Sequence, residues 1–391
     1  MRRSINGMIV QNAQPDCSSK VRRVVQILPE LDDGGVERGV VELNRELVNR
    51  GIDSWVISDG GAQIPTILKH GGHHLSFDVN IKNPFTALMR AVRLRSILNT
   101  ISPDVIHARS RVPAWLCRMA NRHPRRPFVT TVHGLNSINR YSRVMISGDR
   151  VITVSDIVRD HVCRGYNVDP SSMTVIQRGV DLTCFCRSAL DAAWIDGFRH
   201  RHSLIDRYVV TSIGRVTWLK DYETFIRSIA RCVADIPGIV GLIVGGIRPN
   251  KQSYQEELQR LADDEGVADR IIFAGVQSRM PEIYALSDIV VNASLKMGNM
   301  GRTVVESLAM ETPVICTTWP GLENLVHNGV NGQIIDNQSP DQMCDAIQRI
   351  CHDDYTTPQR RAQIRESVPE EYTLDCMVDR IVKVYESAVA G

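Results

Sequence analysis

Two cations that follow one predicted strand have the chemistry to bind a diphosphate. The stretch YVVTSIG, which begins at Tyr208, is rich in β-branched residues and runs into Gly214, Arg215 and, after a short loop, Lys220. A diphosphate leaving group concentrates negative charge, and a site without a metal ion must neutralise it with fixed arginine and lysine donors. The alternative is that Arg215 and Lys220 are solvated surface cations.

A second group of polar residues surrounds a predicted helix start in the same half of the chain. A loop that begins at Ser294 enters this helix at Gly301, Arg302 and Thr303, whose backbone amides could hold a phosphate. Glu306 follows one turn later, and one carboxylate can accept hydrogen bonds from both hydroxyls of a ribose. An isolated acidic surface residue is the alternative for Glu306.

A glycine-rich turn follows the first predicted strand. Gly34 and Gly35 precede Val36 and Glu37 at the start of a predicted helix. Such a turn lets backbone amides approach a sugar or phosphate without an intervening Cβ, and the helix dipole favours negative charge there. A simple tight turn is the alternative. Neither G-x-G-x-x-G after a strand nor G-x-x-x-x-G-K-[ST] occurs, which argues against dehydrogenases and P-loop proteins.

Histidines and arginines follow two further strands of the first half. His107, Arg109 and Arg111 lie at or just past the end of DVIHA, and His133 and Gly134 follow FVTTV. Binding groups collect in the loops at strand ends. We therefore interpret His133 as a candidate substrate contact, although a histidine in this position is often structural.

The elements that must position these residues alternate between strands and helices. One series of β-branched runs comprises VRRVVQIL, DSWVISD, DVIHA, FVTTVH, RVITVS and MTVIQ. A second comprises YVVTSIG, GLIVGG, RIIFAG, DIVVNAS and TPVICT. Each run is followed by a helical pattern, which predicts an α/β protein with two parallel sheets covered by helices.

The length of 391 residues and the hydrophobic content of 43% favour two domains. We predict a loose tail over residues 1–20, a first domain over 21–185 and a second over 186–370, because the segment around Asp181 to Asp206 interrupts the strand pattern. Residues 371–391 are predicted to form an amphipathic helix that can cross back to the first domain.

Composition excludes several classes of protein. The formal charge of +2 gives no support for a nucleic-acid partner. The ten cysteines are scattered without zinc-ligand pairs, which indicates free thiols in a reducing cytoplasm. The N-terminal stretch lacks the apolar run of a signal peptide, and no window approaches the roughly 20 apolar residues of a spanning helix. We expect a cytoplasmic protein that contacts a membrane, if at all, peripherally at its inner face.

Taken together, the motifs resemble glycosyltransferase family 4, retaining enzymes of the GT-B type that use nucleotide sugars. The resemblance runs from about Val24 to Ile350 and includes the further segments Arg178-Gly179-Val180-Asp181 and Gly275-Val276. It implies two Rossmann-like parallel-sheet domains that face each other across a cleft. It also implies a reaction without a metal ion, and no D-x-D triplet occurs in the sequence.

The resemblance also assigns roles to individual residues. Arg215 and Lys220 would hold the diphosphate, Glu306 the ribose, the backbone around Val276 the base, and His133 with Gly35 the transferred sugar. The substrate would be a UDP- or GDP-sugar, with no other cofactor. The candidate residues are His133, Arg215 and Lys220 for catalysis and Gly34, Gly35, Gly214, Val276, Ser294, Gly301, Arg302, Thr303 and Glu306 for donor binding.

Some positions depart from the family pattern. The family has two glutamates separated by seven residues, and the earlier position is Gly298 here. Loss of this charged partner costs about 1.5–3 kcal/mol of sugar binding unless another group, such as Asn299, replaces it. Glu311 stands where a glycine is common, and Trp319 to Glu323 replaces a segment with paired glycines.

The first half also carries a basic region. Between Lys82 and Arg143, Asp104 is the only acidic residue among many arginines. Within it, Phe85, Leu88, Met89 and Val92 alternate with arginines, a pattern compatible with a helix on anionic lipid or against a phosphorylated glycolipid. The alternative is a core-packing helix with a solvated basic face.

Three hypotheses follow, of which a GT-B phosphorylase or sugar-nucleotide epimerase is disfavoured because the basic surface of the first half suits a large anionic acceptor. The first is retaining transfer of a sugar from a nucleotide sugar to a hydroxyl of a cell-surface polysaccharide, lipopolysaccharide or lipid-linked acceptor, with an anionic glycan or glycolipid as partner. The second, motivated by Gly298, is a catalytically weak sugar-nucleotide-binding or scaffold protein in a polysaccharide assembly complex.

Overall fold

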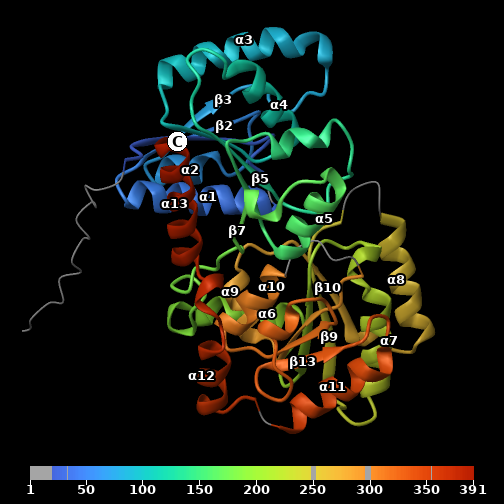
Figure 1. Ribbon diagram of the computed structural model, residues 1–391. Helices are drawn as coiled ribbons and strands as arrows, with labels where there is room; N and C mark the ends of the chain where they lie inside the picture. The colour runs from blue at the N-terminus through green and yellow to red at the C-terminus, as the bar shows by residue number, and fades with distance from the viewer. Residues whose placement is uncertain (1–19, 33, 248–251, 296–300, 354) are drawn as a thin grey trace, which may run out of the picture. The chain divides into compact units, whose positions relative to one another are not determined.

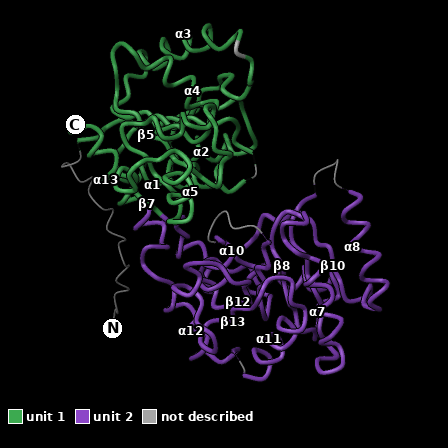
Figure 2. The backbone as a smooth tube through the Cα atoms, turned by 45° about the vertical axis from the view of Figure 1, so that its right-hand side comes forward, with its two compact units in different colours: residues 1–176, 378–391 green, residues 177–377 purple. Residues whose placement is uncertain are grey.

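The chain folds into two compact α/β units. The computed structural model describes residues 20–32, 34–247, 252–295, 301–353 and 355–391. The first unit comprises the chain up to Ile176 together with Val378–Gly391, and the second comprises Gln177–Met377 (Figures 1 and 2). The predicted α/β class with two Rossmann-like parallel sheets is confirmed, whereas the cleft between them stays a prediction.

The first unit is built on a seven-stranded sheet in the order β3-β2-β1-β4-β5-β6-β7, with every neighbouring pair parallel. Parallel neighbours need crossover connections, which the helices between the strands supply. The strands are β1 (Arg23–Ile27), β2 (Asp53–Ser58), β3 (His73–Ser76), β4 (Val105–Ala108), β5 (Phe128–Val132), β6 (Arg150–Thr153) and β7 (Met173–Val175). The helices are α1 (Gly35–Asn49), α2 (Ile64–Lys69), α3 (Pro84–Ile101), α4 (Arg111–Ala120) and α5 (Asp156–Tyr166).

Apolar residues cover both faces of the first sheet. Successive side chains of a strand point to opposite faces, and the neighbours Val56 and Ile57 accordingly belong to different buried clusters. Val56 packs with residues of α1 and α2, whereas Ile57 packs with residues of α3, α4 and α5. Because both faces are buried, the sequences of the central strands are continuous runs of mostly apolar residues.

The second unit repeats the plan with a six-stranded parallel sheet in the order β10-β9-β8-β11-β12-β13. Its strands are β8 (Tyr208–Ile213), β9 (Ile239–Val244), β10 (Ile271–Gly275), β11 (Ile289–Asn292), β12 (Val314–Thr317) and β13 (Gly332–Ile335). Its helices are α6 (Ala192–Arg201), α7 (Tyr222–Cys232), α8 (Gln252–Asp264), α9 (Met280–Leu286), α10 (Arg302–Ala309), α11 (Pro340–His352) and α12 (Pro358–Glu366). Cys232, Cys316 and Cys344 are buried in its core, and every cysteine that the structure describes is a free thiol.

The predicted domain boundary at residue 185 lies inside the second unit, which already begins at Gln177. Val180 forms a parallel bridge with Thr373, and Phe185 is fully buried in the second core. The segment from Asp181 to Asp206, which interrupts the strand pattern, also contains α6, whose Phe198 is buried in the same core. The strand pattern is therefore interrupted by a helix of the second unit and not by a boundary between the units.

The terminal helix α13 (Leu374–Ala390) is attached to the first unit through a buried polar chain. His107 Nδ1 lies 2.7 Å from the Tyr385 hydroxyl, and His107 Nε2 lies 2.7 Å from Thr131 Oγ1. Burial, with a smaller contribution from Arg109, holds the pKa of His107 well below its ordinary value of 6.5. The imidazole is therefore neutral, and its role is structural.

We predict that Tyr385→Phe destabilises the first unit. The change leaves a buried ring nitrogen of His107 without its partner, which costs about 1–3 kcal/mol of unfolding free energy. Urea unfolding monitored by circular dichroism measures the loss. Tyr141→Phe is the matched control because Tyr141 is 40% exposed, and equal stability of both variants would contradict the role of the His107 contact.

Candidate active site

Three glycines follow adjacent strands at the carboxyl edge of the second sheet. Gly214, Gly245 and Gly275 stand at the ends of β8, β9 and β10, all with positive φ, at +152°, +155° and +66°. The Gly214 N–H donates to Val244 O at 2.9 Å, and the Gly245 N–H donates to Gly275 O at 2.9 Å. A Cβ at Gly245 would lie 1.9 Å from Gly214 O, so this edge presents main chain rather than side chains.

Four polar side chains join the strand ends beside these glycines. Lys220 Nζ donates to Ser294 Oγ at 3.0 Å, and Ser294 Oγ donates to Asn292 Oδ1 at 3.0 Å. Asn292 Nδ2 in turn donates to Thr303 Oγ1 at 2.9 Å. Burial lowers the pKa of the half-buried Lys220. The structure thus brings together the predicted residues Lys220, Ser294 and Thr303 through Asn292, which sequence reasoning missed.

Gly301 and Arg215 belong to the same edge. A Cβ at Gly301 would lie 2.1 Å from Asn292 Nδ2, so the close approach of the amide requires a glycine where α10 begins. Arg215 directly follows Gly214 and is exposed. Within the described ranges its guanidinium has no carboxylate partner, so its charge is available to a ligand.

Glu306 is buried and not a surface charge, with 3% of its surface exposed. Tyr284 donates to its Oε2 at 2.7 Å, and Arg302 Nε donates to its Oε1 at 2.8 Å. The Glu306 carboxylate is therefore held at the start of α10 by one neutral and one charged donor. Arg302 is thus a side-chain partner of Glu306, and no sequence pattern indicated Tyr284.

Val276, the predicted base contact, follows the last of the three glycines and is 68% exposed. A Cβ at Gly246 would lie 2.7 Å from Val276 Cγ2, so the chain after β9 passes close to it. The departures at Gly298 and Asn299 lie outside the described residues.

The candidate residues of the first unit surround a separate cavity of about 410 Å³ at the carboxyl ends of β4 and β5. It is within the size range of small-molecule sites. His133 and Gly134 line it after β5, and Arg109 and Arg111 line it after β4. The complete lining is Pro29, Val36, Glu37, Arg109, Ser110, Arg111, Thr131, His133, Gly134, Leu135, Asn136 and Met145.

The glycine turn precedes α1, and its use as a sugar contact stays a prediction. Gly34 is the N-cap of α1 with an extended backbone, φ −173°, which any residue can adopt, and Gly35 is the first helical residue. The space beside Gly34 is taken by the Glu37 side chain, whose Oε2 would lie 2.1 Å from a Cβ there. In the described structure, Val36 and Glu37 line the cavity, whereas Gly34 and Gly35 do not.

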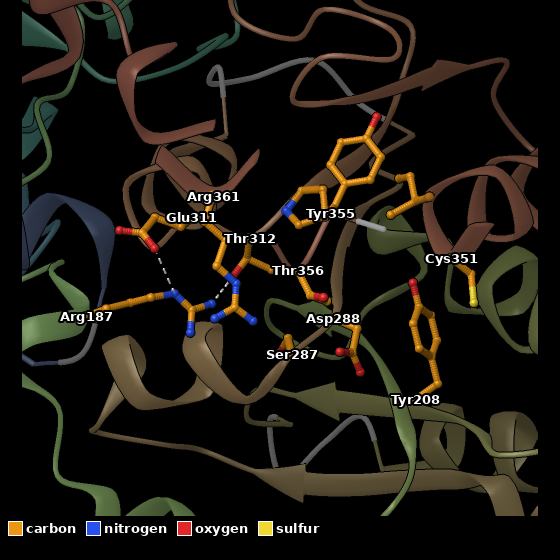
Figure 3. A pocket seen from close by; sticks show the side chains of 12 residues that line it. Arg187, Tyr208, Ser287, Asp288, Glu311, Thr312, Cys351, Tyr355, Thr356 and Arg361 are labelled. Carbon is orange, nitrogen blue, oxygen red and sulfur yellow. Dashed lines mark hydrogen bonds and ion pairs between the residues drawn. The ribbon is translucent and has the colours of Figure 1, made fainter. Parts of the chain in front are cut away.

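A smaller cavity of about 40 Å³ lies at the opposite edge of the second sheet (Figure 3). Tyr208, Asp288 and Pro313 line it at or before the amino ends of β8, β11 and β12. Its volume suits roughly two or three water molecules, and burial raises the pKa of Asp288. Ligands of open α/β sheets bind at the carboxyl ends, so we assign no substrate to this cavity.

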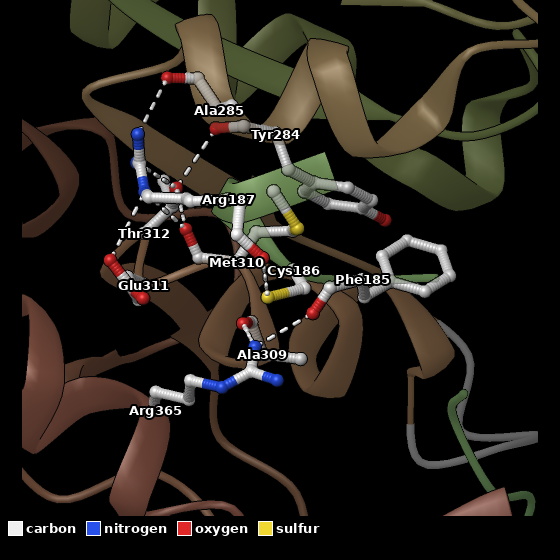
Figure 4. A network of polar contacts seen from close by, with 11 residues as sticks. Phe185, Cys186, Arg187, Tyr284, Ala285, Ala309, Met310, Glu311, Thr312 and Arg365 are labelled. Atoms are coloured by element: carbon white, nitrogen blue, oxygen red, sulfur yellow. Dashed lines mark hydrogen bonds and ion pairs between the residues drawn. The ribbon is translucent and has the colours of Figure 1, made fainter. Parts of the chain in front are cut away.

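The structure explains how Glu311 is accommodated at a position where the family commonly has a glycine. Glu311 ends the turn after α10 with φ +61°, a conformation that favours glycine. Its carboxylate lies 3.3 Å from Arg187 Nε, and Arg187 also donates to Met310 O at 3.0 Å (Figure 4). Arg365 adds contacts to the carbonyls of Phe185 and Ala309. These arginines stabilise a turn that a glycine would form without strain.

Two family models match the chain, one in each half. The model described as Glycosyltransferase Family 4 matches residues 33–183, and the model described as Glycosyl transferases group 1 matches residues 198–370.

Curated relatives and solved structures are similar over much of the chain. A D-inositol 3-phosphate glycosyltransferase of Mycolicibacterium smegmatis is 27% identical over 63% of this chain. The match covers 59% of that relative, which is less than two thirds of the relative's length. The Acidothermus cellulolyticus protein of that name is 26% identical over 92% of this chain and 87% of its own. A glycosyltransferase from Rickettsia africae has a TM-score of 0.85 at 25% identity, covering 94% of this chain and 99% of its own.

A further solved structure shows the same fold. It is Anabaena HepE in complex with UDP and glucose, with a TM-score of 0.79 at 19% identity. The similarity covers 92% of this chain and 98% of HepE.

We predict that Gly245→Ala disrupts the carboxyl edge of the second sheet. The added Cβ would meet the backbone of Gly214 at 1.9 Å and 2.6 Å, whereas Gly275→Ala meets nothing within 4 Å. The control should lose only about 1–2 kcal/mol for its left-handed conformation. Thermal unfolding measures both, and a smaller loss for Gly245→Ala would contradict the proposed constraint.

Proposed function

Because the chain belongs to glycosyltransferase family 4, with a group 1 domain in its second half, we propose that it transfers a sugar from a nucleotide sugar to an acceptor hydroxyl. We propose that the reaction retains the anomeric configuration and needs no metal ion. The charge that develops on the diphosphate is then stabilised by fixed side chains and main-chain donors.

The observation that carries the proposal is the placement of Lys220 and Arg215 at a sheet edge where glycines expose the backbone. Lys220 is half-buried and its partner is the neutral hydroxyl of Ser294. A half-buried ammonium without an anionic partner is unfavourable, and a diphosphate would supply that partner. Arg215 adds an exposed cation one residue after Gly214. Both cations can therefore stabilise the leaving nucleoside diphosphate.

The remaining donor contacts extend this site. We propose that Gly214, Ser294, Gly301, Arg302 and Thr303 surround the phosphates, Glu306 accepts a ribose hydroxyl, and the backbone at Val276 contacts the base. We propose that His133, together with Gly34 and Gly35 of the turn before α1, contacts the transferred sugar. The donor is a UDP- or GDP-sugar, and the UDP and glucose bound by the similar HepE structure support the former.

The proposed acceptor is an anionic glycan or glycolipid used in polysaccharide or lipopolysaccharide synthesis. The relatives named D-inositol 3-phosphate glycosyltransferase use an acceptor that carries a phosphate, according to their name. The basic composition of the chain between Lys82 and Arg143 supports an anionic partner here too.

We predict that Arg215→Ala reduces turnover at least about 100-fold, because one stabilising donor is lost, while the unfolding temperature stays unchanged because Arg215 is exposed. Release of nucleoside diphosphate from a panel of nucleotide sugars measures turnover. Arg260→Ala, an exposed arginine on α8, is the matched control.

Undiminished turnover of Arg215→Ala would remove the proposed role of this arginine. Donor binding by calorimetry without transfer to any acceptor would favour the alternative function, a sugar-nucleotide-binding protein in an assembly complex.

The exposed face of α3 supports a peripheral membrane contact. Phe85, Leu88, Met89 and Val92 are 93%, 70%, 52% and 57% exposed and share one helical face. The opposite face, with Ala91, Leu94 and Leu98, is buried in the core. The apolar residues 85–92 therefore do not all serve the core, as the alternative interpretation required.

Charge and shape favour an anionic bilayer as the partner of this face. The helix carries no acid, and of its three arginines Arg93 is exposed and Arg95 is half-buried, whereas Arg90 is buried with its guanidinium 3.4 Å from Asp78. An apolar face beside exposed cations is typical of helices in the membrane interface. Next to it, α3 and α4 border a cavity of about 460 Å³ lined by Val112, Trp115, Leu116 and other mostly apolar residues. No helix among the described residues has the length and apolar character to span a bilayer. We propose that the protein acts at the cytoplasmic face of a membrane.

We predict that the double variant Phe85→Ser, Leu88→Ser binds vesicles of phosphatidylcholine and phosphatidylglycerol at least tenfold more weakly. Each large apolar side chain contributes about 1.5–3 kcal/mol when fully buried. Flotation with vesicles measures binding, and Leu68→Ser, a 54% exposed leucine on α2, is the control. Equal binding by wild type and double variant would exclude α3 as the contact.

A further inference from the structure

Arg109 is a buried cation without an anionic partner among the residues that the structure describes. Only 7% of its surface is exposed. Its Nη2 donates to Gln26 Oε1 at 2.6 Å, a neutral amide, and its buried Nε has no hydrogen-bond partner in the described structure. Burial also lowers the pKa of Arg109. A buried charge is usually paired with an opposite charge. A purely structural role would therefore leave the positive charge of Arg109 without compensation.

The same arginine lines the cavity of about 410 Å³ in the first unit. It lies beside the start of α4, a helix of 10 residues whose N-cap is Ser110. The Ser110 side chain makes no capping hydrogen bond. Ser110 and Arg111, the first helical residue, also line the cavity. Two guanidinium groups and the positive end of a helix dipole therefore meet at one wall.

Other polar groups around the cavity limit what can bind. Glu37 contributes a carboxylate to the lining, His133 contributes an imidazole, and Asn136 contributes a side-chain amide. Arg111 reaches Ser142 Oγ at 3.4 Å and lies over the Tyr141 ring at 5.7 Å, so it also lacks an anionic partner among the described residues. Two cations against one carboxylate favour an oxyanion at the α4 wall, with hydroxyl groups of a sugar toward Glu37.

We infer that this cavity binds the acceptor through an anionic oxygen group, a phosphate or a carboxylate, held by Arg109, Arg111 and the start of α4. That the anion belongs to an acceptor rests on the proposed glycosyl transfer, whereas anion binding itself does not. The bound oxyanion would complete the pairing of Arg109 and orient the neighbouring sugar hydroxyl. The substrate class is therefore an acidic or phosphorylated sugar.

The test is calorimetric titration of the full chain with inorganic phosphate and, separately, acetate, in the presence of saturating UDP so that the donor site is filled. We expect saturable binding of phosphate, weakened at least tenfold in Arg109→Gln. Arg122→Gln, an exposed arginine after α4, should bind as the wild type does. Binding of phosphate alone indicates a phosphorylated acceptor, and binding of both anions indicates that a carboxylate also suffices.

Because Arg109 is buried, Arg111→Gln provides a second variant at a half-buried position, with an expected loss of at least threefold. Absence of saturable binding to the wild type, or wild-type binding by both variants, would overturn the inference. Binding of UDP and, in a parallel titration, of GDP is recorded in the same series. Absence of binding of both nucleotides, together with Arg109-dependent phosphate binding, would reject the proposed function and leave the anion site standing.

Discussion

Among the described residues, Lys220 of the second unit holds its ammonium group near the sheet edge without a carboxylate partner. Lys220 is half-buried, and its contact is the Ser294 hydroxyl at 3.0 Å. A carboxylate partner would neutralise the charge and compete with a phosphate for it. A hydroxyl leaves the charge uncompensated, and the chain through Asn292 to Thr303 fixes the hydroxyl in place. The site therefore keeps a positive potential at the cost of some stability.

The backbone around Lys220 follows from the same requirement. A Cβ at Gly214 would meet Lys220 Cε at 2.7 Å, and one at Gly301 would meet the Asn292 amide at 2.1 Å. Glycines at these positions let the polar chain pack against the main chain. In the first unit, by contrast, two arginines, Arg109 and Arg111, line the candidate cavity. In both units the candidate residues lie at or beyond the carboxyl ends of parallel strands, where ligands of this architecture bind.

Patterns of residues predicted the described strands except one edge strand of each sheet; the other edge strands, β7 and β10, were predicted. Strands such as β4 and β8 are buried and rich in β-branched residues, whereas β3, with the sequence HHLS, and β13, with GQII, are edge strands without such a signal and were missed. The domain boundary was placed too late because α6 interrupts the strand pattern inside the second unit. Spacing predicted the neighbourhood of Lys220, Ser294 and Thr303, but the Asn292 and Tyr284 contacts depend on strand register and helix packing. Helical periodicity left α3 ambiguous, because this helix has apolar residues on both its buried and its exposed face.

The most direct test is a crystal structure of the protein with a bound nucleoside diphosphate. The account predicts pyrophosphate oxygens within hydrogen-bond distance of Lys220 Nζ and the Arg215 guanidinium, beside the main chain at Gly214. A pyrophosphate bound elsewhere, with Lys220 still paired only to Ser294 and Arg215 directed into solvent, would contradict it.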